Sequence, residues 1–238
     1  MSEIILYDLP SKGRCACGSP NAWKTRLLLN YKELPYKTEW VEYPDLAPTF
    51  KSLGLPPNEE GVPYTIPTIR DTKGRYIMDS RKIADELEKQ HPEPSLHLDS
   101  PLLPKVEAGV LNMAAPLRPV MLPLIPRTRL NAVAVEYFER TREARVGMSL
   151  SQWEKEQGGE KAWEKAGPGF KEVGDMLRAN GGPFLLGKTV SYADFVILGA
   201  LQGFKRIDES FFERSIKIEP ALKTLYDACS VWLERDDH

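Results

Sequence analysis

The sequence predicts an α/β unit followed by an all-helical unit, and three observations carry that prediction. Residues 1–91 alternate short β-rich runs with helical patterns in the order β-α-β-(α)-β-β-α, which is typical of an α/β domain. Residues 92–104 are dense in proline, which indicates a stiff linker rather than a regular element. Residues 105–238 contain only helical patterns, so we expect the second domain to be all-α.

The first unit is divided by hydrophobic periodicity and by turn residues. Trp23, Leu27 and Tyr31 recur every four residues and form one helical face,. A run of β-branched and aromatic residues, 37–43, is typical of a strand,. The expected elements are a strand over 4–7, a helix over 20–31, a strand over 37–43, a short helix over 49–53, a hairpin over 66–78, and a helix from Ser80 that ends before Pro92.

The second unit is expected to contain helices over 105–115, 129–148, 169–180, 191–204 and 219–234. Between the first two of these, Pro116, Pro119, Pro123 and Pro126 follow one another at intervals of three or four residues. A proline inside a helix costs ~3 kcal/mol or more, because it removes a hydrogen bond and clashes with the preceding turn. We therefore expect a kinked or broken segment there.

Residues 65–80 carry the most informative functional pattern. Pro67 lies inside a β-branched run and removes a donor from the strand ladder,. If the Ile66–Pro67 bond is cis, the backbone N–H and C=O of Ile66 face outward and can pair with an extended peptide. Asp79 and Ser80 would lie beside that edge. These residues alone leave two interpretations open, a binding edge for a small charged peptide or an ordinary hairpin with a serine helix cap.

Ser19-Pro20 marks the start of the first helix. Serine is a favoured N-cap and proline a favoured first helical residue. The free N–H groups and the dipole of a helix start attract an anion, and a serine hydroxyl can donate a hydrogen bond to a thiolate. A thiol has a free pKa of about 8.5, which such surroundings lower. An ordinary serine cap is the alternative.

Ser191 and Asp194 have the spacing of a capping box, with Val190 and Phe195 placed as a hydrophobic staple,. We interpret this pair as a structural cap that nucleates a buried helix.

Composition excludes several other classes of function. A net charge of −2, from 32 basic and 34 acidic residues, gives no basic excess for nucleic acid. No basic segment followed by a long apolar run begins the chain, and no stretch reaches the length of a membrane span,. Three cysteines are too few for a disulfide framework, so a reducing, cytoplasmic setting is expected. Scattered histidines and the single Cys15-Ala-Cys17 pair do not match zinc spacing, so no metal is expected,.

In combination, these motifs resemble those of the glutathione transferases over nearly the whole chain. The resemblance rests on four pairs in the expected order, Ser19-Pro20, Ile66-Pro67, Asp79-Ser80 and Ser191 with Asp194. It implies a thioredoxin-like glutathione-binding domain over 1–91, a linker over 92–104 and a helical domain over 105–238. It also implies glutathione as co-substrate, small hydrophobic or aromatic ligands, and a homodimer.

The resemblance assigns a role to each site residue. Ser19 would hold the glutathione sulfur as a thiolate, with Cys17, two residues earlier, as its rival. Ile66, followed by Pro67, would pair with the cysteinyl backbone, while Asp79 and Ser80 would hold the γ-glutamyl group. Lys51, with Lys37 as the alternative, would bind the glycyl carboxylate.

A narrower similarity links Ser-Pro-Asn-Ala-Trp-Lys-Thr-Arg, residues 19–26, to bacterial β-etherases and to the etherase-related, fungal-specific transferases. It implies a serine-type enzyme that uses the thiolate on aromatic electrophiles or peroxides and that detoxifies wood- or lignin-derived compounds. Because serine forms no mixed disulfide with glutathione, conjugation, ether cleavage or peroxide reduction is favoured over disulfide exchange. The alternative is a ligandin that binds aromatic compounds with little turnover.

The electrophile pocket is expected between two walls. Met121, Leu122 and Leu124 of the proline-rich segment would form one wall, and Asn21 and Trp23 the other. Simple core packing of Trp23 and Met121 is the alternative.

Overall fold

The computed structural model describes residues 3–237. Its N-terminal part contains one mixed sheet with the strand order β2-β1-β3-β4. Strand β1 pairs in parallel with β2 and antiparallel with β3, and β3 pairs antiparallel with β4. The strands are β1 (Ile4–Asp8), β2 (Tyr36–Trp40), β3 (Thr68–Arg70) and β4 (Tyr76–Met78).

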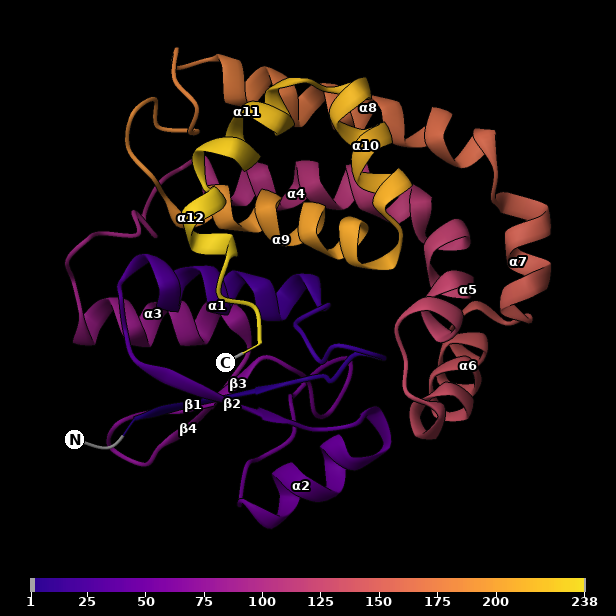
Figure 1. Cartoon of the computed structure of the whole chain (residues 1–238), viewed down its shortest axis with the longest axis horizontal. Coiled ribbons are helices and arrows are strands. Elements are labelled where there is room, and N and C mark those ends of the chain that lie inside the picture. The colour runs from indigo at the N-terminus through magenta and orange to yellow at the C-terminus, as the bar shows by residue number, and fades with distance from the viewer. Residues whose placement is uncertain (1–2, 238) are drawn as a thin grey trace.

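The sheet lies between helices on both faces (Figure 1). Helices α1 (Pro20–Tyr31) and α3 (Ser80–Gln90) cover one face, and α2 (Leu46–Ser52), preceded by the 3-10 turn η1 (Tyr43–Asp45), lies on the other. All five residues of β1 are buried, as expected for a strand covered on both faces.

A buried ion pair joins the central strand to the first helix. Arg26 Nη2 of α1 lies 3.1 Å from Asp8 Oδ2 of β1, and both side chains are fully buried. The same nitrogen donates to Thr38 Oγ1 at 3.0 Å. Removing one partner of such a pair leaves a buried charge and costs about 3–5 kcal/mol, so the packing of α1 on the sheet requires both Arg26 and Asp8.

The C-terminal part is a bundle of helices stacked above α1 and α3 (Figure 1). Helix α9 lies at its centre, contacts α1 below and α4, α10 and α11 within the bundle, and is buried along most of its length. The elements are α4 (Leu103–Ala114), the 3-10 turn η2 (Ala115–Leu117), α5 (Arg118–Thr128), α6 (Ala132–Val146), α7 (Leu150–Gln157), α8 (Glu160–Arg178), α9 (Tyr192–Ile207), α10 (Glu209–Ile218), α11 (Ala221–Ala228) and α12 (Ser230–Leu233).

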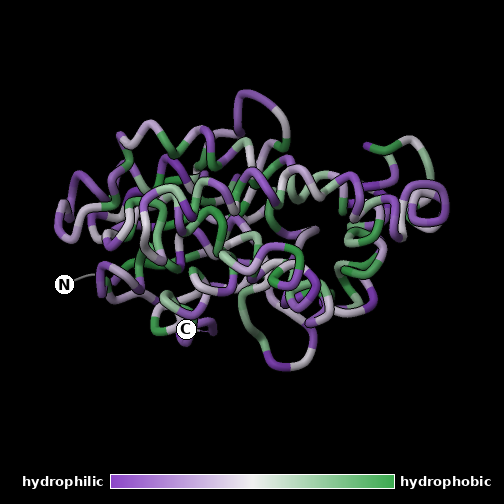
Figure 2. Tube along the Cα trace, turned by 90° about the horizontal axis from the view of Figure 1, so that it is seen from above, coloured by the Kyte–Doolittle hydropathy of each residue, from purple (hydrophilic) through white to green (hydrophobic). Residues whose placement is uncertain are grey.

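Figure 2 shows hydrophobic and hydrophilic positions alternating along most of these helices. This alternation is the amphipathic pattern by which a helix buries one face and exposes the other. In α8 the buried face includes Trp163, Phe170, Val173 and Leu177.

Ser191 and Asp194 form the capping box of α9. Asp194 Oδ2 accepts hydrogen bonds from the Ser191 N–H and hydroxyl, both at 2.8 Å, and Oδ1 accepts from the Leu185 N–H at 2.8 Å. Asp194 therefore fixes both the helix start and the preceding loop.

The structure confirms the thioredoxin-like sheet and the helical second half, with changes in particular elements. The strand predicted over 37–43 ends at Trp40, and the short helix predicted over 49–53 runs from Leu46 to Ser52. The predicted helix over 169–180 begins already at Glu160, because Ala162, Trp163 and Ala166 extend its buried face toward the N-terminus. Helices α7 and α10 were not predicted, and the predicted helix over 219–234 is divided into α11 and α12.

The proline-rich segment is broken at one point and helical elsewhere. The 3-10 turn η2 contains Pro116, and α5 then continues through Pro123 and Pro126. The two lost hydrogen bonds are offset by burial, since both prolines face the core. The helical run over residues 103–128 is long and apolar enough to span a membrane, judged by length and composition alone. This corrects the expectation that no stretch of the chain reaches the length of a membrane span. It packs against α8 and α9 in the bundle, and core helices often pass the same test.

Candidate active site

Two adjoining cavities lie where the hairpin, α1 and the helical bundle meet. The larger, of about 650 Å³, is lined by Ile66, Pro67, Asp79 and Ser80, and the smaller, of about 180 Å³, by Ser19. Both cavities share four wall residues, which are Asn21, Val62, Thr65 and Ile66. The tertiary structure thus brings together residues from distant parts of the chain.

Ser19 is the N-cap of α1, and Pro20 follows as the first helical residue. Its Oγ accepts a hydrogen bond from the Ala22 N–H at 3.5 Å, the outer limit of such a bond. Among the described residues the Ser19 hydroxyl has no acceptor for its own proton, so that proton is available to a group in the small cavity. The helix N-terminus adds a favourable field for an anion there.

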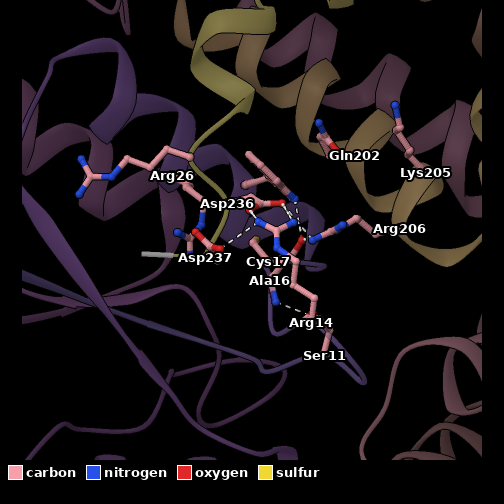
Figure 3. A network of polar contacts seen from close by, with 12 residues as sticks. Ser11, Arg14, Ala16, Cys17, Arg26, Gln202, Lys205, Arg206, Asp236 and Asp237 are labelled. Atoms are coloured by element: carbon pink, nitrogen blue, oxygen red, sulfur yellow. Dashed lines mark hydrogen bonds and ion pairs between the residues drawn. The ribbon is translucent and has the colours of Figure 1, made fainter.

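The loop that precedes Ser19 is held by the C-terminal tail and by α9, as Figure 3 shows. The Cys17 N–H donates to the Asp236 carbonyl at 2.8 Å. The Cys17 carbonyl accepts from Trp23 Nε1 and Arg206 Nε, both at 3.1 Å. Arg14 forms an ion pair with Asp236, and Arg206 Nη2 lies 3.1 Å from Asp236 Oδ2. The position of Ser19 therefore depends on the C-terminal tail and on helix α9 of the bundle.

Gly18 packs closely against the side chain of Arg129 in this loop. A side chain at Gly18 would require the guanidinium of Arg129 to move. Burial lowers the pKa of that guanidinium, and its Nε makes no hydrogen bond among the described residues.

Cys17 does not meet the requirements for the rival nucleophile. Its side chain is fully buried and lines neither cavity. Burial raises the pKa of the Cys17 thiol well above its usual range, and the charge of Asp8 adds to that effect. A reactive cysteine needs access and a lowered pKa, so the structure argues against this alternative.

Ile66 presents an open backbone edge to the large cavity. The Ile66–Pro67 peptide bond is cis. The ladder between β1 and β3 ends at Thr68, and within residues 3–237 the Ile66 N–H and C=O have no hydrogen-bond partner. An extended peptide backbone can pair there.

Asp79, rather than Ser80, is the N-cap of α3, which corrects the alternative of a serine cap. One carboxylate oxygen, Oδ1, accepts from the N–H groups of Arg81 and Lys82 at 2.8 and 3.2 Å. Asp79 has a φ of +90°, which is strained for a residue other than glycine, and such strain often marks functional sites. Ser80 is the first helical residue, and its carbonyl accepts from the Tyr192 hydroxyl of α9 at 3.1 Å.

Neither lysine predicted for the glycyl carboxylate lines the large cavity. Lys51 lies 5.9 Å from the centre of the Tyr64 ring, and Lys37 pairs with Glu3 at 3.2 Å on the outer strand. The cations that do line the cavity are Lys24, Arg81 and Lys82. Burial lowers the pKa of Lys24, while Glu107 and Asp79 oppose that shift.

The walls of the small cavity also differ from the prediction. Asn21 lines it, but Trp23, Met121, Leu122 and Leu124 do not. Trp23 is buried with its Nε1 on the Cys17 carbonyl, and the α5 residues pack toward the core of the bundle. Instead η1 and α6 supply polar and aromatic walls, with Tyr43, Tyr137, Arg142 and Arg145.

Some of the cavity-lining residues that were not predicted lie close to a recognised motif in the sequence. Lys24 follows Ser19 by little more than one helical turn, and Arg81 and Lys82 directly follow Asp79-Ser80, so proximity to the motifs points to them. Tyr137, Arg142 and Arg145 lie in no motif. Only the descent of α6 beside the sheet domain (Figure 1) brings them near Ser19.

Comparisons with known proteins agree with this geometry. Residues 18–90 match the family model "Glutathione S-transferase, N-terminal domain", and residues 107–219 match "Glutathione S-transferase, C-terminal domain". The chain is 32% identical over 260 aligned positions to the "Glutathione S-transferase-like protein ustS" of Aspergillus flavus, covering 98% of this chain and 92% of that protein. The chain belongs to the glutathione S-transferase family.

Solved structures of fungal glutathione transferases are similar to this transferase over nearly the whole chain. One, from Ceriporiopsis subvermispora in complex with glutathione, is 33% identical, with a TM-score of 0.85 and coverage of 97% of this chain and 98% of that chain. GSTFuA2 from Phanerochaete chrysosporium is 28% identical, with a TM-score of 0.87 and complete coverage of both chains. Within residues 3–237 this transferase has no group of three or more metal-ligating side chains.

Proposed function

We propose that this protein binds glutathione in the large cavity and uses its thiolate on an electrophile held in the small one. The carrying observation is the shared wall, because Ile66 borders both cavities while Ser19 lines only the small one. A cysteinyl backbone paired with Ile66 would direct its sulfur across that wall toward the Ser19 hydroxyl.

The remaining glutathione groups have matching partners. Asp79 would accept from the γ-glutamyl ammonium through its carboxylate. Ser80, at the start of α3, would bind the γ-glutamyl carboxylate together with the helix N-terminus. Lys24 lies near Asp79 and has no ion-pair partner within the described residues, so it would bind the same carboxylate. Arg81 already pairs with Asp85 at 3.1 Å.

The reaction follows from a stabilised thiolate. Ser19 would donate a hydrogen bond to the sulfur, and charge-assisted bonds of this kind are stronger than neutral ones. The thiol proton leaves to solvent, the thiolate attacks the electrophilic carbon, a C–S bond forms, and the leaving group departs with its bonding electrons.

The proposal also includes a class, a group of substrates, an oligomeric state and a location for this protein. It comprises the serine-type, etherase-related fungal class, activity on aromatic compounds derived from wood or lignin, a homodimer and a cytoplasmic location. Ser19 at the helix start, with the surrounding sequence over 19–26, supports the class assignment.

A Ser19→Ala substitution tests the thiolate assignment. We expect kcat with chlorodinitrobenzene to fall by about tenfold or more, since a hydrogen bond to a charged group contributes about 1.5–3 kcal/mol. The apparent pKa of bound glutathione, read from thiolate absorbance against pH, should rise toward about 8.5. Affinity for glutathione should change little. Full activity in the variant would refute the role of Ser19, and binding of aromatic ligands without turnover in the unsubstituted protein would favour the ligandin.

A further inference from the structure

The small cavity contains two arginines and no acidic residue. Arg142 and Arg145 of α6 line it together with Ser19 and the rings of Tyr43 and Tyr137. Among residues 3–237, neither arginine forms an ion pair with a carboxylate. Other arginines of the chain do have acidic partners, such as Arg75, Arg178 and Arg214.

Two aromatic rings and a hydroxyl hold the guanidinium of Arg142 in place, but no carboxylate among the described residues neutralises its charge. Its carbon lies 4.4 Å from the centre of the Phe138 ring and 5.1 Å from that of Tyr43. Its Nη1 donates to Thr141 Oγ1 at 2.9 Å. Burial lowers the pKa of Arg142, Tyr43 opposes that shift, and the nearby positive charge of Arg145 adds to it. Two like charges therefore face one cavity, and one of them is largely removed from water.

Such an arrangement favours an anion, because Arg142 is partly buried and Arg145, although exposed to solvent, adds a second positive charge on the same wall. A partly buried charge costs free energy unless it is paired, and the two guanidinium groups also repel each other. Arginine presents a planar fork of donors that matches a carboxylate in two parallel hydrogen bonds. A third guanidinium, Arg129 beside Gly18, adds positive charge near Ser19 without an ion-pair partner in the described part of the chain.

The size and the walls of the cavity restrict the rest of the ligand. At about 180 Å³, the cavity is smaller than the ~300–1,000 Å³ typical of sites for drug-sized molecules. Tyr43, Tyr64 and Tyr137 contribute aromatic surface. A single aromatic ring with one anionic substituent satisfies both the space and the charge.

We propose that the electrophile taken beside Ser19 is a single-ring aromatic compound with an anionic group such as a carboxylate, which Arg142 and Arg145 bind. This inference rests on the proposed function for the reaction, but not for the binding. In the reaction the C–S bond forms at the ring carbon that carries the leaving group, and the leaving group departs with its bonding electrons. The carboxylate is unchanged and serves only to orient the ring.

The test compares chlorodinitrobenzoate with its methyl ester, which lacks the charge but activates the ring more strongly, so each kcat/KM is divided by the rate constant of the uncatalysed reaction with glutathione. With the full chain and saturating glutathione, we expect kcat/KM to be higher for the benzoate. In the double variant R142Q/R145Q, the ratio of kcat/KM for the benzoate to kcat/KM for the ester should fall by at least about tenfold. This is the effect of losing hydrogen bonds to a charged group. Arg140→Gln is the matched control, because Arg140 lies on the same helix but outside the cavity lining, so the ratio should stay within about twofold.

Three results would overturn the proposal. The first is a preference of the unsubstituted protein for the ester. The second is an equal fall of the benzoate-to-ester ratio in Arg140→Gln, which would indicate a long-range electrostatic effect of the whole helix rather than direct binding. The third is a large loss of glutathione affinity in R142Q/R145Q, measured by calorimetry, which would assign the arginines to the glycyl carboxylate of glutathione instead.

Failure of the proposed function is separable from failure of this inference. If neither electrophile is turned over, binding of dinitrobenzoate, which has no leaving group, is measured by calorimetry in the presence of glutathione. Binding that is weakened by R142Q/R145Q and unaffected by Arg140→Gln supports the anion site in a protein that is not a catalyst. Absence of binding overturns the proposal.

Discussion

Ser19 and Cys17 lie two positions apart and have opposite environments. The Ser19 hydroxyl borders a cavity at a helix N-terminus, where an anion is favoured. The Cys17 thiol is fully buried beside the carboxylate of Asp8, and burial raises its pKa. Access and local charge, rather than the intrinsic reactivity of sulfur, therefore favour Ser19 as the residue that acts on a thiol.

At the same scale, Lys24 and Lys51 make a matched pair for a test of glutathione binding. Lys24→Met should weaken glutathione affinity about tenfold, because an ion pair with a carboxylate is lost from a partly buried position. Lys51→Met should change affinity by less than about twofold, because Lys51 lies outside the cavity,. Calorimetric titration with glutathione measures both. A larger effect of Lys51→Met would restore Lys51 as the residue that binds the glycyl carboxylate.

At the scale of an element, the β3–β4 hairpin depends on Asp71. Its Oδ1 accepts from the N–H groups of Lys73 and Arg75, both at 2.9 Å, and its Oδ2 lies 2.7 Å from Arg75 Nη2. Burial by itself would raise the pKa of Asp71, but the hydrogen bonds from Arg75 and Lys73 outweigh it and lower the pKa. The hairpin in turn positions Asp79 at the edge of the large cavity.

Asp71→Asn should therefore destabilise the protein in a pH-dependent way. At pH 7 we expect a loss of about 1.5–3 kcal/mol in the free energy of unfolding. Because the folded-state pKa lies below the unfolded value of about 3.9, the stabilisation is present above that value and is lost as the pH falls through the folded pKa. The difference between the two proteins should shrink in acid.

Urea unfolding at neutral and acidic pH measures this difference. Asp227→Asn is the control, since Asp227 pairs with Lys223 on an exposed helix face and should contribute less than about 1 kcal/mol. A constant difference between the unsubstituted protein and Asp71→Asn at all pH values would contradict the linkage.

At the scale of the whole molecule, the loop before Ser19 is fixed by segments far away in the chain. Arg206 of α9 contacts both the Cys17 carbonyl and Asp236, and the Asp236 carbonyl accepts from the Cys17 N–H. The helical bundle and the C-terminal tail thus position the loop before Ser19 in the sheet domain (Figure 3).

Arg206→Gln should lower kcat by about tenfold, because small displacements of a reacting group are costly in rate. Glutathione affinity should change by less than about twofold, since Arg206 does not line the large cavity,. Steady-state kinetics and calorimetry separate the two effects. Arg214→Gln, which removes the ion pair with Glu160, is the control. Equal losses of kcat in both variants would indicate general destabilisation rather than loop positioning.

The sequence by itself determined the features that depend on neighbours in the chain. The helix start at Ser19-Pro20, the hairpin over 66–78 and the capping box of Ser191 and Asp194 follow from turn, cap and periodicity rules that act over a few residues,. For the same reason, the thioredoxin-like order of elements and the division into a sheet and a helical half were predictable.

Only the tertiary structure decided which side chains meet. It placed Lys24 rather than Lys51 in the large cavity, buried Cys17 and Trp23, and brought Arg142 and Arg145 of α6 to Ser19. These outcomes depend on how α5, α6 and α9 pack across the molecule, and a helical pattern gives the buried face of a helix but not its partner. The partners of Ser19 were therefore set by long-range packing, although its position at a helix start was set by its neighbours in sequence.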